Sequence, residues 1–298
     1  MIKVYSGGSV KTSLRNSFKN SWIDVNKPDK NELKELTKKL KITHDDLLDS
    51  LDVRELPRIE EKKDYIFVVL KAPSNKNGTT LGVFLGKNFI LTVHKDGVKA
   101  LKAVSKSLDK NSFKEGVGSI FYRILLNIVK DFSSNLDSIG DKLDKLEDSI
   151  LKHANDRDLE EAFALKKKLL FFRKSLKADM DVIYRLAKAK GLSRIKGLSD
   201  LYLEVKQIEN TQEIFRERLT EVMDMYMSSV SNKLGDVMRG FTVIASLLLL
   251  PMLISGIWGM NFAVIPWFDN AYGFYFPIVI MFVSVLIMFL FFKKKRWV

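Results

Sequence analysis

Two long apolar segments near the C-terminal end stand out in the hydropathy pattern of the chain. Residues 240–258 (GFTVIASLLLLPMLISGIW) and 274–292 (FYFPIVIMFVSVLIMFLFF) contain no charged side chain. Helices of about 19 residues are long enough to cross a hydrocarbon core about 30 Å thick. The alternative is a pair of buried core helices in a soluble protein, which uncharged runs of this length disfavour. We therefore expect two transmembrane helices joined by a loop over residues 259–273.

Basic residues flank the two apolar segments. Lys233 and Arg239 precede the first segment, and the tail 293–298 begins with Lys293, Lys294, Lys295 and Arg296. Lys and Arg are retained on the cytoplasmic side of a membrane. We therefore expect a multi-pass protein of the plasma membrane, with both termini in the cytoplasm and the loop outside. The basic run has a second interpretation, as an anchor against anionic lipid.

The two segments differ in the size of their side chains. The second is rich in Phe and Tyr, whereas small residues recur along the first, at Gly240, Ala245, Ser246, Ser255, Gly256 and Gly259. Small residues allow helices to approach closely, and bulky aromatics suit lipid and its interface. We expect the first helix inside an assembly and the second around it. Because one helical hairpin cannot enclose an aqueous path, transport would require a homo-oligomer.

Residues 1–112 mix the alternating pattern of strands with the periodic pattern of helices. Strands are expected at 2–5, 22–25 and 65–70, and a hairpin at 81–93 around Gly86-Lys87-Asn88. Helices are expected at 29–41, 43–51 and 97–108. The pattern indicates a cytoplasmic α/β domain. It shows no Gly-rich phosphate loop and no paired catalytic acids, so the sequence does not support an enzyme.

Helical periodicity continues from residue 113 to the membrane. Residues 113–197 are typical of a helical hairpin, with helices at 119–152 and 158–190 that meet at a polar break. The first of these helices carries a series of acids: Asp131, Asp137, Asp141, Asp144, Glu147 and Asp148. They form either an ordinary solvated helix face or a negative field that concentrates cations around the inner opening.

A third helix is expected as a stalk over 198–239 that continues into the first apolar segment. Gly191 and Gly197 break the preceding helix, and Ser199 is a candidate N-cap. A coiled-coil-like seam with 4,3 spacing follows: Leu201, Val205, Ile208, Gln212, Phe215, Leu219, Val222 and Tyr226. Gln212 either sets the register or faces solvent. An unbroken helix over 200–258 would be about 90 Å long, so a displacement in the cytoplasm could reach the membrane without crossing a flexible linker.

Charge and composition limit the ligands that the chain can bind. Lys and Arg number 49 and Asp and Glu 36, giving a net charge of +13. Acids and apolar residues interrupt the basic clusters at helical spacing, which is typical of a solvated helix face, so no nucleic-acid partner is expected. The chain has no Cys and only three widely spaced His. A soft-metal site and thiol catalysis are therefore excluded, and a hard divalent cation is the better candidate.

A short motif at the end of the first apolar segment resembles a known family. Gly259-Met260-Asn261 is followed by Phe262 and preceded by Pro251 and by Gly256-Ile257-Trp258. With the terminal KKKRW and the segment YMSSVSNK at 226–233, the motif resembles the CorA family of magnesium and cobalt ion transporters. The resemblance implies a homopentamer with an α/β cytoplasmic domain, a long helical stalk and two C-terminal transmembrane helices. It also implies potential-driven Mg²⁺ influx that cytosolic Mg²⁺ shuts off.

The resemblance assigns an ion path to the first transmembrane helix. Gly259, Met260 and Asn261 would form the selectivity filter, where a ring of Asn261 amides accepts hydrogen bonds from the waters of Mg²⁺, which dehydrates reluctantly. One helix face would line the pore, with Met238 at the inner constriction: Gly235, Met238, Phe241, Thr242, Ala245, Leu249 and Met252. Without a pore, this stripe would be ordinary helix packing.

The resemblance also assigns regulatory carboxylates. LLDSL at 47–51, followed by Pro57-Arg58, and Ser199-Asp200-Leu201-Tyr202 resemble segments that bind Mg²⁺ between neighbouring subunits. Mg²⁺ between Asp49 and Asp200 would keep the ring shut, and its depletion would free the ring. The alternative is that both are ordinary helix carboxylates. Asp224 resembles an acid facing an axial funnel, and the basic tail resembles a collar at the inner mouth.

The sequence departs from the family pattern in the loop and in the pore. Ala263, Ile265, Pro266, Trp267 and Phe268 precede the first loop acid, Asp269, so cation capture outside should be weaker. Gly235 stands where the family often carries Asn, which puts an inner polar ring in doubt. Two other functions stay open. One is a transporter of Zn²⁺, Co²⁺ or Ni²⁺ from the same superfamily, which Met260 and the lack of Cys disfavour, and the other is a membrane-anchored scaffold.

Overall fold

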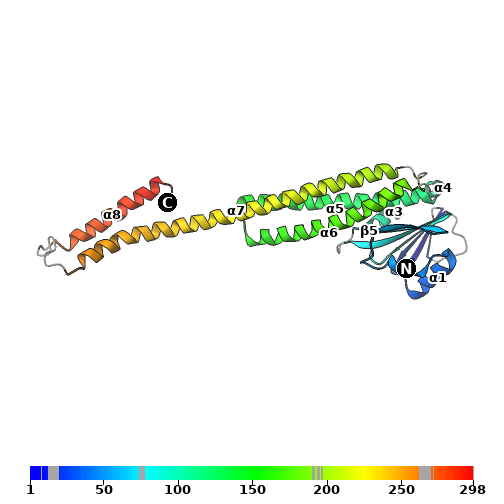
Figure 1. The fold of residues 1–298 in the computed structure, drawn as a ribbon, viewed down its shortest axis with the longest axis horizontal. Coiled ribbons are helices and arrows are strands. Elements are labelled where there is room, and N and C mark those ends of the chain that lie inside the picture. The colour runs from blue at the N-terminus through cyan, green and yellow to red at the C-terminus, as the bar shows by residue number, and fades with distance from the viewer. Residues whose placement is uncertain are drawn as a thin grey trace. The chain divides into compact units, whose positions relative to one another are not determined.

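The computed structural model describes residues 1–7, 9–12, 20–73, 78–189, 192, 195, 197–261, 270 and 272–297. The chain forms two compact units, Met1–Met223 and Asp224–Val298 (Figure 1). The N-terminal unit holds a sheet and its covering helices, and the C-terminal unit holds the two apolar helical segments.

A seven-stranded sheet forms the centre of the N-terminal unit. Its strands lie in the order β2-β1-β3-β7-β6-β5-β4. The described pairings are antiparallel except for β3 with β7, which are parallel. The expected strands are confirmed, and the structure adds two that the sequence pattern did not predict, β2 and β4. The bounds are β1 Ile2–Ser6, β2 Ser9–Lys11, β3 Ser21–Asn26, β4 Arg58–Glu61, β5 Tyr65–Ala72, β6 Thr79–Gly86 and β7 Phe89–His94.

Helices cover both faces of the sheet. On one face, α1 (Lys30–Leu40) and α2 (His44–Asp49) pack on alternate residues of β5, β6 and β7, including Phe67, Phe84 and Leu91. Helix α1 begins at a capping box in which the Asp29 carboxylate accepts backbone N–H groups and Glu32 reaches back. On the other face lie α3 (Lys99–Ser107), α5 (Val117–His153) and α6 (Asp156–Lys188), while α4 (Lys110–Lys114) packs on α5 (Figure 1).

The hairpin of α5 and α6 is confirmed within two residues at each end. Helix α5 buries a stripe from Ile120 to Ile150, and Asn155 caps α6 by accepting the backbone N–H of Asp158 at 3.2 Å. The Asp158 carboxylate also accepts the Ser149 hydroxyl at 2.8 Å, which ties the two helices together at the turn. A polar break of this kind stops one helix and starts the next.

Helix α7 extends from Leu198 to Trp258 over 61 residues and passes from one unit into the other. The predicted cap at Ser199 is wrong, because the helix begins one residue earlier. Gly197 has a left-handed φ of +92° and accepts the Leu201 N–H at 2.9 Å, so it occupies the capping position. The predicted seam is buried from Leu201 to Val222, except for the half-buried Phe215, and Gln212 lies inside it instead of facing solvent.

The C-terminal unit contains the rest of α7 and helix α8 (Tyr275–Lys294). Both helices are long and apolar enough to cross a membrane. The less exposed positions in the apolar part of α7 recur at helical spacing and form one face: Val243, Ser246, Leu247, Leu250, Pro251, Ile254 and Trp258. At the end of this face the Trp258 ring contacts the Phe276 ring of α8, with centroids 5.8 Å apart. This face of α7 therefore turns toward α8.

Candidate functional site

The C-terminal end of α2 carries Asp49 and sits directly on strand β6. The contact depends on Gly82, because a Cβ at this position would lie 1.9 Å from the Ser50 hydroxyl oxygen. Ser50 is fully buried and donates to the Asp46 carbonyl at 2.8 Å, which ends the helix against the sheet. A glycine in a strand is often explained by such a close approach. The absence of a side chain at Gly82 thus allows the end of α2, which carries Asp49, to pack directly on β6.

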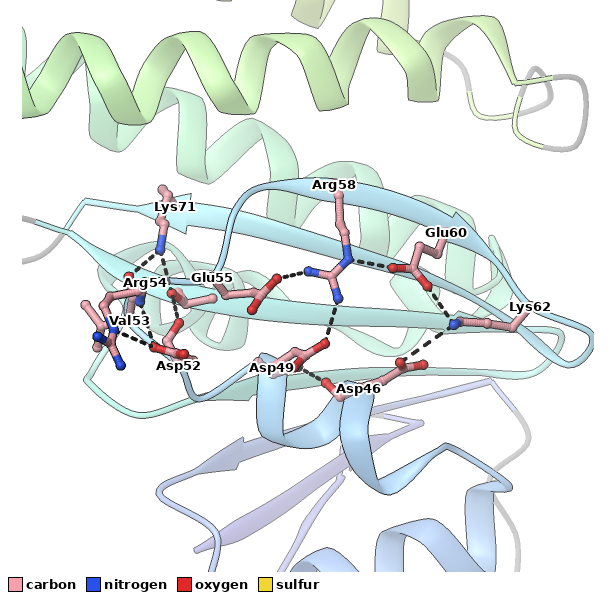
Figure 2. Close-up of polar contacts among 12 residues, drawn as sticks. Asp46, Asp49, Asp52, Val53, Arg54, Glu55, Arg58, Glu60, Lys62 and Lys71 are labelled. Carbon is pink, nitrogen blue, oxygen red and sulfur yellow. Dashed lines mark hydrogen bonds and ion pairs between the residues drawn. The ribbon is translucent and has the colours of Figure 1, made fainter.

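Arg58, the first residue of β4, binds three carboxylates (Figure 2). Its Nη2 donates to Asp49 Oδ2 at 2.6 Å, its Nε donates to Glu60 Oε1 at 2.6 Å, and its Nη1 pairs with Glu55. The guanidinium carbon lies 5.4 Å from the centroid of the Phe67 ring. Burial alone would lower the pKa of Arg58, but the hydrogen bonds to Glu60 and Asp49 and the charge of Glu55 raise it above its usual value.

Lys62 extends the same network along β4 and β5. Its ammonium lies 2.6 Å from Glu60 Oε2 and 3.7 Å from Asp46 Oδ1, and the Tyr65 hydroxyl donates to Asp46 Oδ2 at 2.7 Å. Hydrogen bonds from Lys62 and then Arg58 lower the pKa of Glu60. We call this set the Arg58 cluster: Asp46, Asp49, Glu55, Arg58, Glu60 and Lys62. With all six ionised it carries four negative and two positive charges, so two negative charges remain.

Lys71 of β5 fixes the loop that joins α2 to β4 (Figure 2). Its ammonium donates to the Val53 carbonyl at 2.6 Å and to the Thr80 hydroxyl at 2.8 Å, and Thr80 donates to the Asp52 carbonyl at 2.7 Å. Its backbone N–H donates to Asp179 Oδ1 on α6 at 2.8 Å. Burial raises the pKa of Asp179 well above its usual value, and burial lowers the pKa of Lys71. The loop that carries Glu55 is therefore held by strand residues.

The two predicted regulatory acids differ in their surroundings. Asp49 is half-buried and paired with Arg58, whereas Asp200 is exposed in the first turn of α7, where the helix dipole favours a carboxylate. Within the described part of a single chain, no group of three or more His, Cys, Asp and Glu residues is placed to hold a metal ion.

The predicted pore-lining residues all lie on an exposed side of α7. Gly235, Met238, Thr242, Ala245, Leu249 and Met252 recur at three- and four-residue spacing, and the adjacent Phe241 is 66% exposed. At 3.6 residues per turn, this stripe is centred about 150° around the helix from the face that turns toward α8. The Thr242 hydroxyl is satisfied by the Met238 carbonyl at 2.8 Å. In one chain the stripe is free of α8.

The predicted filter residues follow the last turn of α7. The Gly259 N–H donates to the Ser255 carbonyl at 2.9 Å, and the Met260 N–H donates to the Ile257 carbonyl at 3.2 Å. Asn261 is exposed. Gly259 does not adopt a left-handed φ, but a Cβ there would lie 3.3 Å from the Ser255 carbonyl. Its small size suits a tight helix end rather than an unusual φ. Residues 262–269 and 271, which include the predicted loop departures and Asp269, lie outside the described residues.

The remaining predicted charges lie at exposed positions, except for Asp131 and Glu147 on α5, which are half-buried. Asp224 is exposed on α7. The basic residues at the end of α8 are also exposed, at a helix C-terminus where the dipole favours cations: Lys293, Lys294, Lys295 and Arg296. On the acid-rich helix α5, Asp144 and Glu147 accept from Arg218 Nη2 at 2.9 and 2.7 Å. Part of the predicted acidic field is therefore neutralised by α7.

The Arg58 cluster is the feature that sequence reasoning missed. Asp49, Glu55, Arg58 and Glu60 lie on a helix, a loop and a polar strand, so no helical or strand period links them. Arg58 follows Asp49 by nine residues, so the two are close in the sequence, but no pattern in the sequence predicts that their side chains pair.

Comparison with known proteins accounts for nearly the whole chain. The family model described as CorA-like Mg²⁺ transporter protein matches residues 18–294. The cobalt/magnesium transport protein CorA of Methanocaldococcus jannaschii is 34% identical over 93% of this chain and 91% of its own length. The protein of the same description from Thermotoga maritima is 29% identical over 84% of this chain and 75% of its own.

Solved structures agree with the sequence comparison. The complete structure of the CorA magnesium transporter from Methanocaldococcus jannaschii matches with a TM-score of 0.85 and 31% identity, covering 100% of this chain and 99% of that one. The full-length CmaX protein matches with a TM-score of 0.74 at 18% identity and supports the fold alone. The predicted architecture, an α/β domain with a long helix and two apolar C-terminal helices, is confirmed. The chain belongs to the CorA-like Mg²⁺ transporter family.

Proposed function

We propose that this protein is a divalent-cation channel that carries Mg²⁺ into the cell down the membrane potential. The observation that carries the proposal is the family match over residues 18–294, together with Gly259-Met260-Asn261 at the end of the helix that bears the exposed stripe. A potential of 100 mV supplies about 4.6 kcal/mol for a divalent ion, twice the value for a single charge. Transport would therefore need no chemical step, and no enzymatic role is proposed.

The exposed stripe on α7 supports a conduit formed by several copies of the chain. Met238, Leu249 and Met252 are 64%, 64% and 70% exposed in one chain. Apolar side chains of this kind can line a narrow path that gates by dewetting. In this proposal the stripes of a homo-oligomer, a pentamer by family resemblance, surround one axis, and α8 lies outside toward lipid. The basic end of α8 would keep both termini in the cytoplasm of a plasma-membrane protein.

Asn261 would select the ion at the outer end of the conduit. An amide oxygen accepts hydrogen bonds from the waters of a hydrated cation, and Mg²⁺ gives up its waters reluctantly. A ring of exposed Asn261 side chains would therefore bind the hydrated ion without a full charge. Co²⁺ is the second candidate cargo, because the relatives from Methanocaldococcus jannaschii and Thermotoga maritima are both described as cobalt/magnesium transport proteins.

Asp49 and Asp200 would sense cytosolic Mg²⁺ between subunits. Their support is that Asp49 is partly accessible and Asp200 is exposed, while a single chain gathers no metal-binding group in its described part. Two carboxylates facing each other across a boundary repel unless a divalent ion lies between them. Occupied sites would hold the ring closed, and loss of Mg²⁺ would release it.

Ion flux tests the channel role directly. We expect purified protein in liposomes to take up Mg²⁺ under an inside-negative potential, as reported by a trapped Mg²⁺-sensitive dye. Asn261→Ala should lower the initial rate at least about tenfold, because each subunit loses its amide from the ring. Asn270→Ala, which removes an amide from the same loop outside the signature, is the matched control and should retain most of the rate. Absence of uptake by wild-type protein would favour a scaffold, and equal rates for both variants would exclude Asn261 as the filter.

Protease protection tests the sensor. Mg²⁺ should protect the wild-type protein from limited proteolysis and protect Asp200→Ala only at much higher concentration. Asp181→Ala, at an exposed carboxylate on α6, should behave like wild type. Equal protection of all three proteins would remove Asp200 from the proposed sensor.

A further inference from the structure

We propose that Arg58 is a built-in competitor for the divalent cation at Asp49, and that it sets the Mg²⁺ concentration at which the sensor fills. This inference rests on the proposed sensor role of Asp49. Arg58 and a cation would use the same carboxylate, because Arg58 Nη2 already donates to Asp49 Oδ2 at 2.6 Å. A cation that takes this oxygen must first displace a charge-assisted hydrogen bond, which is among the stronger polar contacts in proteins.

The geometry allows Arg58 to release Asp49 without losing its place. Its Nε remains on Glu60 at 2.6 Å and its Nη1 remains on Glu55 (Figure 2). The centroid of the Phe67 ring lies 5.4 Å from its guanidinium carbon. Three of the four contacts therefore persist when the fourth is exchanged. The side chains are also accessible to a cation, since Asp49 keeps 36% and Arg58 27% of their side-chain surface exposed.

The charge of the cluster favours the exchange. Asp46, Asp49, Glu55 and Glu60 outnumber Arg58 and Lys62 by two charges, which one divalent cation would balance. Lys62 lies on Glu60 and Asp46 and does not contact Asp49, so it leaves the Asp49 position to Arg58 alone among the described ion pairs. The net negative field attracts the cation, and Arg58 raises the concentration needed to hold it.

Two substitutions that each remove one positive charge from the same region test the competitor role. Arg58→Gln should lower the Mg²⁺ concentration for half-maximal protease protection of the full-length protein about tenfold, as expected for loss of one charged hydrogen bond. Arg54→Gln is the matched control, because Arg54 lies in the same loop, is 93% exposed and contacts Asp52 rather than Asp49. It should shift the midpoint less than about twofold, as expected for an exposed charge.

Two further variants keep the result interpretable. Asp49→Asn should abolish protection in the Mg²⁺ range that protects wild type. Arg58→Lys retains the charge but cannot hold three carboxylates at once, so its midpoint should fall between wild type and Arg58→Gln. Thermal unfolding without divalent cations checks that each variant folds, and if Arg58→Gln does not fold, Arg58→Lys carries the test.

The outcomes separate this inference from the proposed sensor. If Asp49→Asn abolishes protection but the Arg58 variants leave the midpoint unchanged or raise it, Asp49 is a sensor and the competitor role is wrong. Equal shifts in Arg58→Gln and Arg54→Gln would show a general charge effect and overturn the competitor as well. If Asp49→Asn behaves like wild type, the sensor role of Asp49 fails, and the competitor role fails with it.

Discussion

The two units of the chain differ in the exposure of their largest apolar side chains. In the N-terminal unit, Trp22, Phe67 and Phe84 are completely buried inside one chain. In the C-terminal unit, Met252 is 70% and Phe282 71% exposed. A soluble monomer rarely exposes a contiguous apolar surface of this kind. The N-terminal unit therefore buries its sheet core within one chain, whereas the C-terminal unit leaves an apolar surface that lipid and, in the proposed assembly, further copies of the chain would cover.

Polar groups show the same contrast. In the N-terminal unit, Arg58 connects residues of a helix, a loop and a strand, and Lys71 connects strand β5 to the preceding loop and to the distant Asp179 on α6. The hydroxyls of Thr242 and Ser284 in the C-terminal unit instead donate to carbonyls of their own helices, at 2.8 and 2.7 Å. Helices in lipid must satisfy their polar groups internally. The polar contacts thus separate a unit whose side chains tie its elements together from a unit whose side-chain hydroxyls are satisfied within single helices.

The close approach at Gly82 gives the largest expected effect. Gly82→Ala should destabilise the N-terminal unit by about 3 kcal/mol, because its Cβ would overlap the buried Ser50 side chain and push α2 from the sheet. Thermal unfolding of the full-length protein measures this. Gly97→Ala, where the nearest atom is the mobile Lys102 ammonium at 3.9 Å, should change stability little. Similar losses for both variants would contradict the role given to Gly82.

The buried Asp179 should make stability depend on pH. Burial raises its pKa in the folded state, so the folded protein retains a proton that the unfolded chain loses near pH 3.8. The stability that the protonated carboxyl contributes is fully present below that pH and is lost as pH rises through the folded pKa. Asp179→Asn keeps an acceptor for the Lys71 N–H and should be more stable than wild type by about 1–2 kcal/mol at pH 8. Unfolding curves at pH 5 and pH 8 should show the difference between the two proteins growing with pH, and a constant difference would refute it.

The exposed stripe of α7 predicts a change in gating. Leu249→Asn should raise Mg²⁺ leak at saturating cytosolic Mg²⁺ about tenfold, because a polar side chain hydrates an apolar constriction. Leu250→Asn, one residue further on the face that turns toward α8, is the control and should raise leak little. Liposome flux with Mg²⁺ on both sides compares them. Equal leak through both variants would place the conduit elsewhere.

The smallest expected effect concerns Gln212 in the seam of α7. Its amide is buried, and neither amide atom has a hydrogen-bond partner within the described chain. Gln212→Leu should therefore stabilise the N-terminal unit by about 1 kcal/mol in thermal unfolding. A loss of stability would show that the amide binds ordered water or contributes to register.

Local sequence pattern predicted most of the fold, and its failures have physical causes. The long helices and the hairpin strands β6 and β7 carry strong periodicity, and β5 is a nearly continuous apolar run. The polar edge strand β4, with sequence RIEE, has no apolar alternation, and the three-residue β2 is too short to show one. The parallel pairing of β3 with β7 joins residues about 70 positions apart, so no local pattern encodes it.

The candidate site was predicted less completely than the fold. The pore and filter assignments, which rest on helical spacing and a short motif, stay predictions. The counter-ion of Asp49 is not, because Arg58 reaches it only after α2 docks on Gly82 and the loop is fixed by Lys71. The family resemblance therefore pointed to the Asp49 carboxylate but not to the Arg58 guanidinium that pairs with it.

The mass of the detergent-solubilised particle tests the central claim most directly, because a single hairpin cannot enclose an ion path. Light scattering with the detergent contribution subtracted should give a protein mass several times that of the 34.2 kDa chain, and about five times it if the family resemblance holds. A protein mass of 34.2 kDa, maintained in lipid nanodiscs, would contradict the account.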